Sequence, residues 1–110
     1  MKQHITIEQF KEIGVKMQGD IMSYTDKKGD GVLYYKECAE RITIGKMIEI
    51  LKDMCIIQHK TFKIVHDISK LSKDMFYVDL SNCMDGNITW HKKELCDALW
   101  EAVKEAQHEI

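Results

Sequence analysis

The sequence predicts an all-α domain, and three observations lead to this fold class. Proline, the residue that most strongly interrupts helices, is absent. Apolar residues recur every three or four positions over most of the chain, which is the period of a helix with one buried face. Two Asp-Gly turns, Asp30-Gly31 and Asp85-Gly86, punctuate that pattern. The predicted layout is a helix-loop-helix, a long helical connection and a second helix-loop-helix.

The composition is that of one small domain. The 110 residues are enough to bury a core, and 45% apolar with 31% charged residues is ordinary for a globular chain. The net charge of −2 argues against nucleic acid as a partner. We expect a cytoplasmic protein without a membrane span, because no apolar run is long enough and the N-terminus lacks the apolar stretch of a signal peptide. Four cysteines are then expected as reduced core residues: Cys38, Cys55, Cys83 and Cys96.

The first half of the chain carries clear helix signals. Thr6-Ile7-Glu8-Gln9 has the form of a capping box, so the first helix is predicted to begin at Thr6 and to run to about Tyr24. The helix after the first turn is predicted from about Tyr35 to Ile42. A long helix comes next, since five apolar residues share one face: Ile44, Met47, Ile48, Leu51 and Cys55.

The second half is harder to divide. Its apolar stripe continues with a change of phase, which predicts a break between two helices near His59 to Thr61 or near Ser69 to Ser72. The last helix is predicted from about Thr89 to about Gln107. The two tryptophans, Trp90 and Trp100, are expected at the edges of its buried face.

The twelve residues from Asp26 to Glu37 have the pattern of a calcium-binding loop. Ca²⁺ takes six to eight oxygen ligands, and a tight loop supplies them with alternating carboxylates, a glycine at the turn and a late bidentate glutamate. Counted from Asp26, acids fall at positions 1, 5 and 12 and a glycine at position 6. The predicted ligands are the carboxylates of Asp26, Asp30 and Glu37, the Val32 carbonyl and a water held by Tyr34.

Lys28 occupies the third position of this loop, where an acid is usual. Its positive charge repels a divalent cation, so we expect weak binding of Ca²⁺, with Mg²⁺ as the alternative ion.

This segment resembles the loop of the EF-hand superfamily of calcium-binding proteins. The layout of the chain resembles the N-terminal half of sarcoplasmic calcium-binding proteins. The resemblance implies a paired EF-hand domain over residues 1–110, with hand 1 at about 6–44, a helical connection at about 45–68 and a degenerate hand 2 at about 69–108. It also implies a function as a cytosolic calcium sensor or buffer.

The second turn is predicted to be an EF-hand loop that has lost its ligands. Asp85-Gly86-Asn87-Ile88 repeats the order of Asp30-Gly31-Val32-Leu33, but the loop, at about 79–92, places Lys92 where the closing glutamate belongs. A hard cation is not held there without that carboxylate. We therefore expect a structural loop, in which Ile88 pairs with Leu33.

Two alternatives to calcium binding stay open. A metal-independent module would grip a partner protein helix with a methionine-rich groove, although core filling is the simpler role for the methionines Met17, Met22, Met47, Met54 and Met75. In the other alternative, Asp30-Gly31 is a hairpin turn in a helical protein without calcium chemistry.

Other chemistry has little support in the sequence. Cys55, His59 and His66 offer at most three zinc ligands, and no fourth is in view. No nucleophile with a nearby base and no glycine-rich phosphate loop occurs, so no enzymatic activity is expected.

Overall fold

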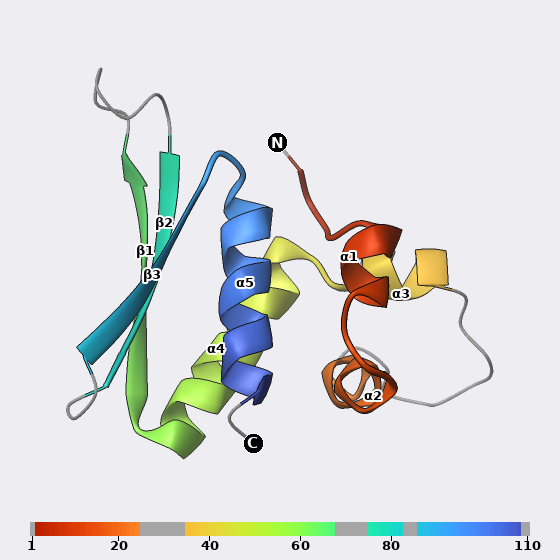
Figure 1. Cartoon of the computed structure of the whole chain (residues 1–110), viewed down its shortest axis with the longest axis horizontal. Coiled ribbons are helices and arrows are strands. Elements are labelled where there is room, and N and C mark those ends of the chain that lie inside the picture. Colours follow the sequence, from red (N-terminus) through yellow and green to blue (C-terminus); the bar gives the residue numbers. More distant parts are fainter. Residues whose placement is uncertain (1, 25–34, 68–74, 83–85, 109–110) are drawn as a thin grey trace.

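The computed structural model describes residues 2–24, 35–67, 75–82 and 86–108. Over these ranges the chain forms five helices and three strands, and the prediction of an all-α fold is therefore wrong (Figure 1). In chain order the elements are α1 (Ile7–Lys11), α2 (Val15–Met22), α3 (Tyr35–Arg41), α4 (Ile44–Gln58), β1 (Lys60–Asp67), β2 (Met75–Asn82), β3 (Gly86–Lys92) and α5 (Leu95–His108).

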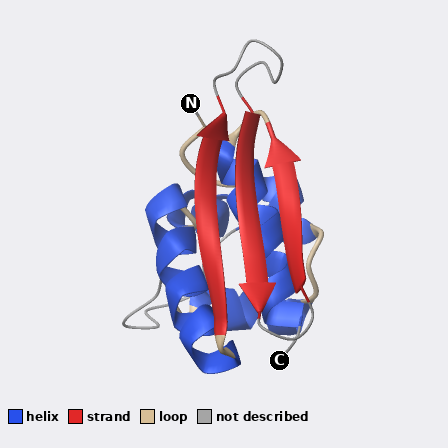
Figure 2. Ribbon diagram, turned by 90° about the vertical axis from the view of Figure 1, so that its left-hand side faces the viewer, coloured by secondary structure: helices blue, strands red, loops and turns tan. Residues whose placement is uncertain are grey.

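The strands form one antiparallel sheet in the order β1-β2-β3. Figure 1 shows three layers: the sheet, then α4 and α5, then α1 to α3 on the far side of these two helices. Figure 2 shows the opposite face of the sheet, which no described helix covers. Helices α4 and α5 pack against each other, and on the sheet α4 covers β1 while α5 covers β2 and β3.

The capping box at Thr6 is confirmed. The Thr6 side chain accepts a hydrogen bond from the Gln9 backbone, and the Gln9 side chain accepts one from the Thr6 backbone. The predicted single helix to Tyr24 is instead two short helices, because Gly14 adopts an extended conformation and serves as the N-cap of α2. Glycine is well tolerated at an N-cap, and this role explains its presence inside an otherwise helical pattern.

The next two helices lie where the sequence predicts them. Helix α3 buries Cys38 and Ala39. Helix α4 begins after Thr43, whose side chain accepts a hydrogen bond from the Lys46 backbone, and it ends at His59. His59 adopts a left-handed conformation with φ 55°, so the predicted break near this residue is confirmed.

The segment after that break is a strand and not a helix. The helical connection predicted at 45–68 is correct only as far as the end of α4, because residues 60–67 form β1. The degenerate hand predicted at 69–108 is likewise replaced by the β2–β3 hairpin and α5. Side chains in these strands alternate between the helix-covered face and the open face, which satisfies a strand period and not a helical one.

Helix α5 begins at Leu95, six residues later than predicted, because the residues from Thr89 belong to β3. Its buried face contains Leu99 and Val103, as expected. Trp100, predicted at the edge of this face, is instead fully buried.

A single hydrophobic core joins the three layers. It includes Phe10 and Ile21 from the N-terminal helices, Leu51 from α4, Val78 from the sheet and Trp100 from α5. The sheet, the central helices and the N-terminal helices are therefore parts of one packed unit.

Candidate functional site

The predicted calcium loop connects α2 and α3, and most of it falls outside the described residues. Four of its five predicted ligands belong to that part of the chain: Asp26, Asp30, Val32 and Tyr34. The fifth, Glu37, lies in the first turn of α3 with an exposed side chain. The described residues thus provide a helix on each side of the acidic segment and its closing glutamate at the start of the second helix.

The second predicted loop, at 79–92, lies within a β-hairpin, which corrects its interpretation as a degenerate EF-hand loop. Ile88 was expected to pair with Leu33, which lies outside the described residues, and in the sheet Ile88 stands opposite Leu80. Strand pairing with β2, and not a partner loop, fixes the position of Ile88.

The described residues bring no three metal-ligating side chains together. Of the zinc candidates, Cys55 is buried in α4, and burial raises the pKa of its thiol. His59 is exposed at the end of α4, and the His66 ring stacks on Phe76 with 4.2 Å between ring centroids.

The methionines serve the core more than a groove. Met47 and Met54 are fully buried in α4. Met17, Met22 and Met75 are half-buried. Core filling accounts for Met47 and Met54, so α4 has no methionine-rich surface.

The sheet end where β3 meets α5 carries positive charge. Lys92 and Lys93 are exposed immediately before α5, and neither forms an ion pair with a described residue. Of the nearby acids, Asp97 pairs with the Lys2 ammonium group, and the Glu94 carboxylate accepts a hydrogen bond from the Lys2 backbone N–H. The N-terminus of a 14-residue helix adds partial positive charge to this end.

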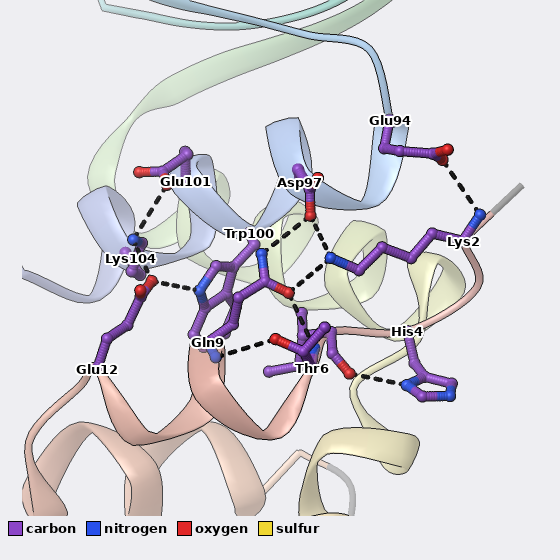
Figure 3. Close-up of polar contacts among 11 residues, drawn as sticks. Lys2, His4, Thr6, Gln9, Glu12, Glu94, Asp97, Trp100, Glu101 and Lys104 are labelled. Carbon is purple, nitrogen blue, oxygen red and sulfur yellow. Dashed lines mark hydrogen bonds and ion pairs between the residues drawn. The ribbon is translucent and has the colours of Figure 1, made fainter.

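Polar contacts join the N-terminal segment and α1 to α5 (Figure 3). The Lys2 ammonium group donates to Gln9 Oε1 at 2.8 Å and to Asp97 Oδ1, and Gln9 Nε2 donates to the same aspartate oxygen at 2.9 Å. Burial alone would raise the pKa of Asp97, but these two donors outweigh it and the pKa is lowered.

A second group of contacts lies two turns further along α5 (Figure 3). Glu12 Oε1 accepts hydrogen bonds from the Trp100 indole at 2.9 Å and from the Lys104 ammonium group at 2.6 Å. Burial opposes ionisation of Glu12, yet the bonds from Lys104 and Trp100 prevail and its pKa is lowered. An open cleft of about 410 Å³ lies beside this group, with Trp90 on its wall.

A smaller cavity of about 300 Å³ lies between α2, α4 and α5. Its lining residues are Lys16, Asp20, Ser23, Tyr24, Met54 and Gln107. Gln107 is only 7% exposed, and its Nε2 atom has no hydrogen-bond partner. Sequence reasoning missed this residue, although one signal was available: a glutamine four positions after Val103 falls on the buried face of α5.

Within the described ranges, no helix combines the length and apolarity that crossing a membrane requires. No protein-family model, no curated protein and no solved structure matches this chain.

Proposed function

We propose that the chain is a cytoplasmic calcium-binding protein whose site is the segment between α2 and α3. The observation that carries the proposal is the place of Glu37, the closing acid of the sequence pattern, in the first turn of a helix. From there a bidentate carboxylate can face oxygens of the preceding loop, as calcium loops require. The other ligands of the proposal are Asp26, Asp30, the Val32 carbonyl and a water held by Tyr34.

The proposed site differs from a paired EF-hand, since the second half of the chain forms a sheet. A single loop with Lys28 near the ion binds weakly, with an expected Kd of about 10⁻⁴ to 10⁻³ M, the loose end of the range for such loops. Binding would draw Glu37 and the start of α3 toward the ion. Because α3 contributes Cys38 to the core, this movement reaches the packing of the N-terminal helices.

Calorimetric titration of the purified protein with Ca²⁺ tests the proposal. We expect one saturable event per chain, which the Glu37→Gln variant loses because an amide cannot give a cation two charged oxygens. Glu40→Gln is the matched control, since Glu40 is exposed on the same helix and only approaches Lys36 at 3.9 Å. Lys28→Asp should tighten binding at least tenfold by removing the repulsive charge.

No heat and no NMR shift at millimolar Ca²⁺ would exclude this function. It would favour the metal-independent module that binds a partner helix. Equal binding by the parent protein and by Glu37→Gln would show that the ion lies elsewhere. Repeating the titration with Mg²⁺ decides between the two ions.

A further inference from the structure

The edge strand β3 leaves apolar side chains uncovered. Among the described strands it pairs only with β2. Every residue of β3 is exposed except Trp90, which is half-buried. Ile88 is 47% exposed, although it stands opposite the buried Leu80 and therefore lies on the helix-covered face of the sheet. An edge strand of this kind can pair with a further strand, and such pairing would cover Ile88 and Trp90.

The other edge strand, β1, is less suited to pairing. Lys63 is exposed near its middle, and a lysine in that place is a common protection of sheet edges. Helix α4 also covers β1, directly at the edge. Two copies paired through β1 would bring their α4 axes to about one strand spacing, ~5 Å, which is closer than helices pack.

Helix α5 leaves the space that pairing through β3 requires. It packs on both β2 and β3, so its axis lies inside the edge by about half a strand spacing, ~2 Å. Two copies paired through β3 would then place their α5 axes about 10 Å apart, which is an ordinary packing distance for two helices. The geometry therefore permits a continuous sheet through β3 and opposes one through β1.

We infer that the chain forms a two-fold symmetric dimer in which β3 pairs antiparallel with β3 of a second copy. A two-fold axis at Thr89, the middle of the strand, aligns its whole length and keeps the helices of both copies on one face of the sheet. Ile88 of each copy then stands opposite Trp90 of the other, and Thr89 opposite Thr89. Aromatic with β-branched and threonine with threonine are favourable cross-strand pairs. The dimer does not depend on calcium binding.

The charges of the two copies are complementary in this register. Lys92 of one copy stands opposite Gly86 of the other. Figure 1 shows α5 running back alongside β3 from the Lys92 end, so the last turns of α5, with Glu105, lie toward the Gly86 end. Neither Lys92 nor Glu105 forms an ion pair with a residue that the structure describes. The dimer brings Lys92 of each copy toward Glu105 of the other.

Sedimentation equilibrium of the full chain in EDTA, from micromolar to millimolar protein, tests the inference. We expect the mass to rise with concentration from that of one chain, 12.9 kDa, to that of two. Ile88→Lys should weaken association at least tenfold, because the second copy brings Lys92 diagonally beside the new ammonium group. Val65→Lys is the matched control, since Val65 is 37% exposed on the other edge strand and its replacement should leave association unchanged.

Reversal of the charged pair provides a second test, which does not depend on the folding of Ile88→Lys. Lys92→Glu and Glu105→Lys should each weaken the dimer severalfold, and the variant with both changes should restore it. Lys92 precedes α5 and Glu105 lies near its other end, so restoration requires a contact between two copies.

A mass of one chain at every concentration overturns the inference. A dimer that Ile88→Lys leaves intact, or that Val65→Lys weakens equally, also overturns it, because the interface would then lie elsewhere. Failure of the charge reversal to restore association would contradict the register centred on Thr89.

Discussion

Two segments share a sequence pattern, Asp-Gly followed two residues later by an aliphatic residue, but they lie between different kinds of element. Asp30-Gly31-Val32-Leu33 falls between two helices, whereas Asp85-Gly86-Asn87-Ile88 leads from one strand into the next. In the second segment Gly86 has φ +80° and pairs with Asn82 across the hairpin. The shared order indicates a turn in both places and does not decide which elements the turn connects.

The burial pattern of the flanking residues determines which elements form. In β2, the buried residues Phe76, Val78 and Leu80 alternate with half-buried ones, as in a strand with one covered face. In α3, Cys38 and Ala39 are buried next to each other, and the flanking residues are exposed, as on a helix face. The first segment therefore lies between two helices, α2 and α3, and the second lies between two strands, β2 and β3.

Among substitutions at contacts between these two regions, Trp100→Ala should cause the largest loss of stability. Trp100 is fully buried in α5 and bonds to Glu12 of the N-terminal region. Losing its ring should reduce the free energy of unfolding by about 3–5 kcal/mol. Urea unfolding followed by circular dichroism and by Trp90 fluorescence measures the loss. Trp100→Phe, which keeps a ring but loses the indole donor, should cost much less.

The same experiment shows whether the two regions unfold together. Their shared core predicts one transition with coincident signals from both probes. A helical signal that disappears before the Trp90 signal would contradict a single cooperative unit and would separate the N-terminal helices from the sheet.

Two glycine substitutions should have smaller effects of opposite sign. Gly86→Ala puts a β-carbon at φ +80° and should cost about 1–2 kcal/mol, because a left-handed conformation disfavours any side chain. Gly19 lies inside α2 with no atom within 4 Å of the added carbon, so Gly19→Ala should stabilise the protein by up to ~1 kcal/mol. Thermal unfolding of both variants checks the prediction, and a change of stability in the same direction in both variants would contradict it.

The smallest expected effect concerns pH and the contacts between α1 and α5. The pKa values of Glu12 and Asp97 are lowered from ordinary values of 4.5 and 3.8. A carboxyl group with a lowered pKa stabilises the fold above its ordinary value, and this stabilisation is lost as pH falls through the folded-state value. The melting temperature should therefore fall below about pH 4.5.

Glu12→Gln should remove part of that pH dependence, while Glu40→Gln on the exposed face of α3 should leave it unchanged. Melting curves between pH 7 and pH 3 measure both variants. Identical pH profiles for the parent protein and Glu12→Gln would show that this contact does not link the two regions.

The sequence predicted the fold correctly where signals were local. The capping box at Thr6 and the apolar face of α4 need only neighbours within one or two helical turns. The strands were missed because Phe62 and Val65 could extend a helical stripe, and no glycine or proline marked the change. The available signal was the alternation through Phe76, Val78 and Leu80, which depends on pairing with distant strands.

The candidate sites also differ in whether their residues are close together in the sequence or only in the folded chain. The acidic segment that closes at Glu37 stays a prediction from the sequence, because residues 26–34 lie outside the described ranges. The cavity with Gln107 and Tyr24 could not be predicted, because α2, α4 and α5 meet there only after the whole chain has folded. Trp100 was misplaced for a related reason, since its indole meets Glu12, a residue 88 positions earlier in the chain.

The left-handed conformation of His59 at the end of α4 has a practical consequence for engineering. Its φ of 55° is unfavourable for histidine, and glycine or asparagine adopts it more readily. Exchanging His59 for glycine should gain roughly 1 kcal/mol, which corresponds to several degrees of heat resistance in a chain of this size. A more stable variant made in this way would leave the acidic segment before α3 and the cavity between α2, α4 and α5 unaltered, which suits assays that need a long-lived sample.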